Sequence, residues 1–474
     1  MTTLSHAHRI VTESADALSR LERFLEERRT AKDTITDFEV FEKELHSIVC
    51  EVEQDALALE LSKLNIDAPI VEINGVPHRQ VLRCEETYFS AAGPVRVKRS
   101  LYSTREAGER TICPMELRAG IVEGRWTPLS AKQATWAVAH LTPKEAEEMF
   151  QVMGNMTPSK SSLDRLPKQL SSKWEEEREA FEAALRSQET VPEEAVTVAV
   201  SLDGVLVPMM DGQRQEKRAS AEAEGKKTRG TAGYSEASCG TVSFYDAEGE
   251  LLSTIRMGRM PEKKKVTLKS MLQSEVQKVL DERPDLRLIK MADGALDNWR
   301  FLSDPEMLPA GEEVVDFYHA CEHLSVAFKA AYGESNPKAK AQWEKWRHIL
   351  RYEEDGVERV IRALAYLKKQ HPRSKKIARE LRYFRKNRGR MSYAVLAAQH
   401  LPIGTGIVEA ACKTLATSRL KRSGMRWREA GGQAILTFRA LVQSDRFESA
   451  WELLRAVYVE EVKVPENVIV LNAR

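Results

Sequence analysis

The chain has 474 residues, of which 42% are hydrophobic and 30% charged, enough for two to four soluble domains. Its 72 basic and 71 acidic residues nearly cancel, so any nucleic-acid surface has to be a local basic patch. The scattered cysteines form no Cys-x-x-Cys pair, which argues against a disulfide framework and a zinc ribbon and suits a reducing cytoplasm. Because we find no signal-peptide core and no apolar run near the ~20 residues of a membrane span, we expect a soluble, cytoplasmic protein. The six cysteines are Cys50, Cys84, Cys113, Cys239, Cys321 and Cys412.

The N-terminal part changes character along its length. Leucine and phenylalanine among charged residues predict helices up to about residue 65. An Asn-Gly pair and the alternation of apolar and basic residues in SAAGPVRVKRSLY predict a β-ribbon over 68–104 with one basic face. Helices are expected again from about 129.

The next segment resembles two helices joined by a turn. The first helix is expected to begin near Thr142 with Glu145 as a capping-box partner, and Gly154 marks the turn. The second is expected to begin at Ser161 or Ser162. An ordinary helical hairpin gives the same pattern, but we favour a DNA-binding helix-turn-helix because Lys160, Ser161 and Ser162 would present donors at the start of its recognition helix.

The central part has an informative order of elements: three strands, a helix, a strand, a short helix and a fifth strand. Three sequential strands suit an antiparallel meander, and the alternation after them suits parallel additions. This is the order of a ribonuclease H-like fold. A polar loop is expected over 211–234, after the first strand. The strands are predicted at 195–204, 239–246, 251–257, 287–294 and 313–320, with a helix at 263–282.

A densely charged, all-helical stretch follows, and beyond it a helix is expected to begin near Gly406, with Glu409 in its first turn. The fold class is therefore mixed, combining α+β and α/β parts. A ribonuclease H-like catalytic domain is interrupted by a helical insertion and preceded by a helical and β-ribbon DNA-binding region. The predicted segments are 1–66, 67–128, 129–192, 193–323, 324–402 and 403–474.

Asp203 and Asp293 both end apolar strands, where a charge is costly unless it is paired or binds a metal. On neighbouring strands the two carboxylates would repel each other, and a divalent cation would remove the conflict. Two Mg²⁺ ions (or Mn²⁺) about 3.5–4 Å apart can activate an attacking oxygen and stabilise a leaving one in phosphodiester chemistry. Glu409 is the candidate for a third ligand.

Each acid also has an ordinary interpretation. The Asp-Gly pairs at 203–204 and 293–294 could mark strand exits, and Glu409 could simply complement the helix dipole. The functional interpretation depends on all three acids occurring in this order on these elements.

A second polar group follows the predicted fifth strand. Asp316, His319 and His323 could form a metal site, but we favour a supporting pair, Asp316 and His319, that shapes the wall of the site. Cys321 lies too close to His323 for standard zinc ligation.

The helix that carries Glu409 has a basic continuation in which acidic residues are absent from 410–428. This local excess predicts phosphate contacts beside the scissile bond, with Trp427 packing on the core or on an unpaired base. A solvated helix face is the alternative. We read Thr405 as a cap of this helix. The predicted DNA contacts here are Lys413, Arg419, Lys421, Arg422, Arg426 and Trp427.

Together these motifs resemble the DDE transposases of bacterial insertion sequences, in particular the ISKra group, and more distantly the Mutator-type transposases. The resemblance covers about 80–474. It implies that Asp203, Asp293 and Glu409 form the metal-binding triad and that Asp316 and His319 match an auxiliary Asp-x-x-His. The cysteine-rich knuckle of related chains is reduced to Cys113, so we do not expect zinc there. The motifs are SLDGVLVP, GTVSFYDAEGE, MADGALDNW, DFYHACEHL and GIVEAACKTLATSRLKRSGMRW.

The resemblance implies hydrolysis at transposon ends, followed by attack of the freed 3′-hydroxyls on target DNA. The N-terminal region would recognise the terminal inverted repeats of double-stranded DNA, and a homodimer would bring two ends together. One alternative is another ribonuclease H-like nuclease, such as a resolvase, which would hydrolyse without joining strands. The other is a domesticated DNA-binding protein, which would be indifferent to Asp293→Asn.

Overall fold

The computed structural model describes residues 17–30, 37–104, 110–210, 212–225 and 233–466. It is a mixed helix and sheet structure with two sheets, of four and five strands. Its contacts divide the chain into two compact units, one of Met1–Phe181 with Glu448–Arg474 and the other of Glu182–Phe447. Among the described residues, no helix is long and apolar enough to cross a membrane.

The first unit contains the predicted β-ribbon. Val95 and Val97 are buried while Arg96 and Lys98 are exposed, so the alternation in the sequence does place basic side chains on one face. The sheet order is β3-β2-β1-β9, and the long helix α2 packs against β3. Residues 17–30 are also helical. These elements are α2 (Phe38–Leu64), β1 (Ile70–Ile73), β2 (Val76–Ser90), β3 (Gly93–Ser103), α3 (Pro114–Ala119) and β9 (Val462–Lys463).

Strand β9 differs from the prediction, which assigns 403–474 to the catalytic core and its tail. Glu72 and Ile73 of β1 pair antiparallel with Lys463 and Val462. The short helix α19 (Phe447–Ala456) precedes it. Because β1 has a free edge that β9 can cover, the end of the chain joins the first unit.

Three further helices of the first unit pack together: α4 (Pro128–His140), α5 (Pro143–Met153) and α6 (Lys160–Glu176). The capping box at Thr142 and Glu145 is present, and Gly154 ends α5 with a φ of 79°. Helix α6 begins at Lys160, one residue earlier than expected, because the Ser159 side chain accepts the Ser162 N–H and serves as the cap.

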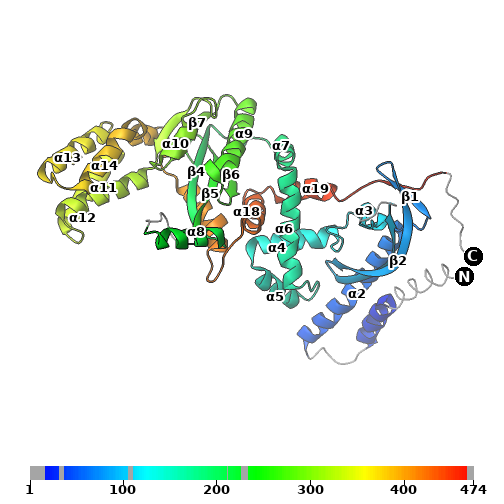
Figure 1. Ribbon diagram of the computed structural model, residues 1–474. Helices are drawn as coiled ribbons and strands as arrows, with labels where there is room; N and C mark the ends of the chain where they lie inside the picture. The colour runs from blue at the N-terminus through cyan, green and yellow to red at the C-terminus, as the bar shows by residue number, and fades with distance from the viewer. Residues whose placement is uncertain (1–16, 31–36, 105–109, 211, 226–232, 467–474) are drawn as a thin grey trace, which may run out of the picture. The chain divides into compact units, whose positions relative to one another are not determined.

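The second unit contains a five-stranded sheet in the order β6-β5-β4-β7-β8, drawn in green in Figure 1. Strand β4 pairs antiparallel with β5, and β5 antiparallel with β6, whereas β7 is parallel to β4 and β8 parallel to β7. This confirms the predicted meander followed by parallel additions. The strands are β4 (Thr197–Pro208), β5 (Tyr234–Tyr245), β6 (Leu251–Arg259), β7 (Arg287–Ala292) and β8 (Glu312–Val315).

Helices cover the sheet, and the helical insertion continues from its β8 edge. Helix α9 packs on β5 and β6. The insertion is helical throughout, as predicted, and forms the bundle drawn in yellow in Figure 1. The helices are α7 (Arg178–Gln188), α9 (Val266–Glu282), α10 (Leu296–Leu302), α11 (Phe317–Tyr332), α12 (Pro337–Tyr352), α13 (Gly356–Gln370), α14 (Lys375–Asn387), α15 (Tyr393–Ala398), α16 (Gly406–Ala411), α17 (Ser418–Leu420) and α18 (Glu429–Gln443).

Two predicted elements of this unit are wrong in detail. The expected polar loop contains helix α8 (Gly212–Ala223), because its Gln, Arg, Glu, Lys and Ala residues favour a helix; residues 226–232 lie outside the described residues. The fifth strand ends at Val315 instead of residue 320. Asp316 caps α11 by accepting the His319 N–H, and this cap starts the helix at Phe317.

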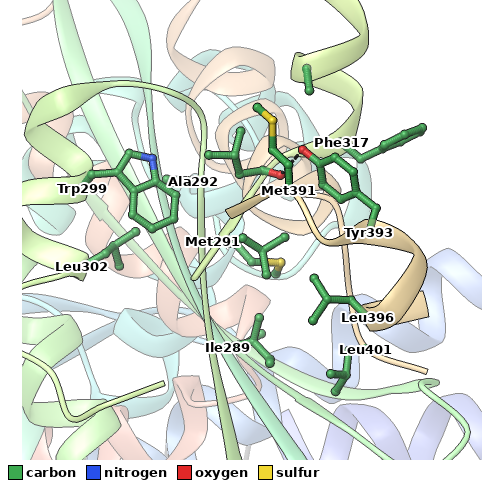
Figure 2. Packing of buried hydrophobic residues seen from close by; sticks show 14 of the residues in the cluster. Ile289, Met291, Ala292, Trp299, Leu302, Phe317, Met391, Tyr393, Leu396 and Leu401 are labelled. Atoms are coloured by element: carbon green, nitrogen blue, oxygen red, sulfur yellow. Dashed lines mark hydrogen bonds between the residues drawn. The ribbon is translucent and has the colours of Figure 1, made fainter. Parts of the chain in front are cut away.

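The core of the second unit joins the sheet to the insertion. Figure 2 shows Ile289 and Met291 of β7 packing toward Leu396 and Leu401 of the insertion. Nearby, the Tyr393 hydroxyl donates to the Val315 carbonyl over 2.8 Å. This shared core fixes the helical bundle against β7, the strand that Asp293 follows.

Candidate carboxylate site

Asp203 and Asp293 lie at the same level of two neighbouring parallel strands. The last paired residues of β4 and β7 are Ser201 and Met291, and each aspartate follows two residues later. Asp203 does not end its strand, contrary to our expectation, because β4 continues to Pro208 along its antiparallel partner β5. Asp293 directly follows the last residue of β7, Ala292. Both side chains are half-buried.

The two faces of the sheet are covered differently. Side chains alternate along a strand, so Leu202 and Asp203 face opposite sides. The α9 face is the one opposite Asp203, since Leu272 of α9 packs directly on Gly240, the partner of Leu202. On the Asp203 face, the Cys412 sulfur lies 4.0 Å from Oδ2 of Asp203. Cys412 follows α16, so the helix of Glu409 covers the aspartate face.

The charge of Asp203 is destabilised by its surroundings. Burial raises the pKa of Asp203, and the negative charge of Asp293 raises it further. The Gly204 N–H, which donates to Oδ1 over 2.7 Å, lowers this pKa. The pKa of the Cys412 thiol is raised by its hydrogen bond to Cys239 and by burial. A cation at this point would relieve the penalty on the carboxylate.

Asp293 is held by its own chain segment. Its Oδ1 accepts the Ala295 N–H over 3.0 Å and the Asn298 side-chain amide over 3.1 Å. Its backbone carbonyl accepts the Trp299 indole N–H over 2.6 Å. These bonds come from the turn into α10 and its first helical turn, so the aspartate is fixed before any ligand binds.

One lysine approaches the site on a strained backbone. Lys264 and Lys265 have φ values of 58° and 55°, in the left-handed region that side chains other than glycine seldom adopt. The Lys265 ammonium lies 3.0 Å from the Glu236 carboxylate and 3.3 Å from Oδ1 of Asn298. Its positive charge lowers the pKa of Asp203. Lys265 is not predicted from the sequence, since nothing in the Lys-Lys-Lys run distinguishes it from its neighbours.

Glu409 lies in the first turn of α16, as predicted, and is exposed. Thr405 occupies the N-cap position, as predicted, but its side chain makes no capping bond to the helix backbone. Its hydroxyl lies 2.9 Å from Oδ2 of Asp316 and 3.1 Å from Oε1 of Glu409. A hydroxyl has one proton, so Thr405 links the two carboxyl groups but can donate fully to only one of them.

The auxiliary residues occupy one corner of the site. Asp316 is buried and bonded to Thr405 and to the backbone of His319. His323 pairs with Glu380 of α14, while His319 lies 3.5 Å from Glu322. Within the ranges that the structure describes, no three His, Cys, Asp or Glu side chains gather closely enough to hold a metal ion.

The predicted basic surface is only partly exposed. Arg419 is 1% exposed, with its guanidinium 5.6 Å from the Trp427 ring, so it is removed from the set of surface contacts. Trp427 is half-buried; its backbone bonds to Pro208 and Met210, and its indole N–H donates to the Leu420 carbonyl over 2.9 Å. The exposed members are Lys413, Lys421, Arg422 and Arg426.

At the start of α6, Lys160 and Ser161 are exposed and Ser162 is half-buried. The donors expected there are partly occupied. The Lys160 N–H donates to Glu147 over 2.8 Å, and the Ser162 N–H donates to Ser159.

No protein-family model matches the chain, and no curated protein matches it. Among solved structures, the chain is similar to one in the Drosophila P element transposase strand transfer complex. The match covers 71% of this chain and 82% of that chain, with 11% sequence identity and a TM-score of 0.25. This is a weak similarity to a transposase, and the geometry of Asp203 and Asp293 therefore carries the functional proposal.

Proposed function

We propose that this chain is a DNA transposase whose ribonuclease H-like domain performs metal-dependent phosphoryl transfer at Asp203 and Asp293. The observation that carries the proposal is the register of β4 and β7, in which Ser201 pairs with Met291 and the two aspartates follow at one level. The strand order β6-β5-β4-β7-β8, with its antiparallel first three strands, is the order expected for that fold.

The donors suit a hard divalent cation. Asp203 and Asp293 offer carboxylate oxygens, which Mg²⁺ and Mn²⁺ prefer. Burial raises the pKa of Asp203 and the charge of Asp293 raises it further, and a bound cation would lower it. Two ions would be held by these aspartates. Glu409, which does not gather with them among the described residues of the free chain, would join them as the third acid of a DDE triad. When bound, they supply an activated oxygen nucleophile and stabilisation of the leaving oxygen.

The chain itself provides orientation. Asn298 and the Ala295 N–H hold one oxygen of Asp293, which leaves the rest of that carboxylate for a ligand. Thr405 holds Glu409 through its hydroxyl. Asp316, fixed by Thr405 and the start of α11, ties the loop before α16 to the sheet.

The substrate would be double-stranded DNA at the ends of a mobile element. The exposed lysine and arginine side chains that follow Glu409 would contact phosphates next to the scissile bond. The α5–α6 pair, with Lys160, Ser161 and Ser162, would contribute to recognition of the terminal repeats. Hydrolysis would free 3′-hydroxyl ends, which then attack target DNA in a homodimer that holds two ends.

The test is cleavage of a supercoiled plasmid that carries this gene with its flanking DNA, in Mg²⁺ or Mn²⁺. The wild-type chain should cut at the ends of the element, and Asp203→Asn and Asp293→Asn should bind the flanking DNA but not cut it. Asp281→Asn is the matched control, because Asp281 is an exposed residue near the end of α9, before β7 begins.

Three outcomes would change the proposal. Cleavage by Asp203→Asn and Asp293→Asn at the wild-type rate would remove these residues from the chemistry. Cutting without any joining of 3′-hydroxyl ends to a target plasmid would favour a nuclease. DNA binding without cleavage by any variant, wild type included, would favour a domesticated DNA-binding protein.

A further inference from the structure

Tyr383 brings the helical insertion into contact with the carboxylate site. It lies on α14, and its ring stacks on His323 of α11 with centroids 3.6 Å apart and planes inclined by 21°. The same ring lies against Gly294, where an added Cβ would lie 2.3 Å from Cε2 of the tyrosine. The ring therefore rests on the backbone of the residue that follows Asp293.

The hydroxyl of Tyr383 is buried and has no hydrogen-bond partner among the described residues. Four other tyrosines in buried surroundings differ from it, because each of their hydroxyls is hydrogen-bonded to a carboxylate or a backbone carbonyl. They are Tyr88, Tyr102, Tyr393 and Tyr458. An unpaired buried hydroxyl costs free energy, and natural structures seldom retain one without a use.

The surroundings make this hydroxyl a donor. Burial raises the pKa of Tyr383, and the negative charges of Asp293 and Asp316 raise it further. The phenol thus keeps its proton at any physiological pH. It is a neutral donor close to two carboxylates, and it bonds to neither of them.

The ring is held rigidly. His323 is paired with Glu380, one turn before Tyr383 on α14, and Glu380 is 0% exposed and is also paired with Arg379. The backbone carbonyl of Tyr383 accepts the Asn387 side-chain amide over 3.1 Å. The hydroxyl is also shielded from solvent, so a ligand reaches it only after the side chains that cover it shift, while the ring itself stays in place.

We propose that the Tyr383 hydroxyl donates a hydrogen bond to a non-bridging oxygen of the DNA phosphodiester bound beside Asp203 and Asp293. The proposal rests on the function proposed above and adds a residue from the insertion to the site. It explains why the hydroxyl is unpaired in the free chain, and it gives the insertion a direct part in the reaction.

The experiment compares wild type with Tyr383→Phe, which keeps the ring and removes only the hydroxyl. On the plasmid described above, cleavage by the variant should fall about 10- to 100-fold, the loss typical of a hydrogen bond to a charged group. Its midpoint of thermal unfolding should stay equal or rise, since no protein hydrogen bond is lost. Once the cut is mapped, a sulfur in place of a non-bridging oxygen there should slow the wild type more than the variant.

Two controls separate a substrate contact from a structural role. Tyr393→Phe loses a bonded buried hydroxyl and should lower the unfolding midpoint. Tyr366→Phe, at a side chain 62% exposed on α13, should change neither cleavage nor stability. Equal cleavage by wild type and Tyr383→Phe would overturn the inference about Tyr383 and leave the proposed function standing. The same holds if Tyr383→Phe lowers the unfolding midpoint as much as Tyr393→Phe does. A wild-type chain that leaves the plasmid intact would overturn the proposed function and this inference with it.

Discussion

The contact between Gly294 and Tyr383 predicts a strong dependence of one residue on the other. A Cβ at position 294 would lie 2.3 Å from Cε2, 3.1 Å from Cδ2 and 3.3 Å from Cζ of the ring. Gly294→Ala must therefore displace a ring that is stacked on His323. Overpacking of this kind costs about 1–3 kcal/mol. We expect Gly294→Ala to lower the free energy of unfolding by that amount.

The cost should disappear when the ring is removed. In a Tyr383→Ala background the three atoms nearest to the new methyl group are gone, and the reduced freedom of the unfolded chain gives a gain of up to about 1 kcal/mol. Urea denaturation of the wild type, the two single variants and the double variant measures the coupling. If Gly294→Ala costs the same in both backgrounds, the ring does not rest on Gly294 and our account of the site is wrong.

Three further predictions concern stability. Asp203→Asn should raise the free energy of unfolding at neutral pH in EDTA. Because the pKa of Asp203 is raised in the folded chain, its protonated form favours folding, and this contribution is lost as pH rises through the folded-state pKa. The stability gained by Asp203→Asn should therefore shrink toward zero near pH 3.8. A gain in stability that does not depend on pH would contradict this. Arg446→Met should cost about 3–5 kcal/mol in urea denaturation, because Glu275, 3% exposed, would lose its charge partner; a cost under about 1 kcal/mol would refute the pairing. Leu272→Ala should cost about 2–5 kcal/mol, since its buried side chain fills the space above Gly240; a smaller loss would mean that α9 packs loosely there.

Local patterns were enough to predict most of the second unit. The apolar runs that become β4 and β7 are bounded by polar residues, and the order of strands and helices follows from them. The level placement of Asp203 and Asp293 also follows, since neighbouring parallel strands bring corresponding residues together.

The Asp-Gly pairs illustrate where local reasoning stops. Each pair was equally consistent with a turn, yet neither Gly204 nor Gly294 has a positive φ. Gly204 lies within β4, and Gly294 allows a ring from α14, some ninety residues away, to approach the backbone. That requirement depends on tertiary packing, which no local pattern contains.

The same reason explains the other differences. Asp316 belongs to an apolar run that suggests a longer strand, but its side chain caps α11 and ends β8 early. Thr405 suits a helix cap in sequence, yet its hydroxyl is used by Asp316 and Glu409. Arg419 reads as part of a basic surface but packs against Trp427 in the interior. In each case a partner distant in sequence determines what the side chain does.

The central claim is that Asp203 and Asp293 together bind divalent cations that serve phosphoryl transfer, and calorimetric titration with Mn²⁺ tests it most directly. We predict that the wild-type chain and Asp281→Asn bind Mn²⁺ alike, whereas Asp203→Asn and Asp293→Asn each lose most of that binding. Equal binding of Mn²⁺ by all four chains would contradict the account.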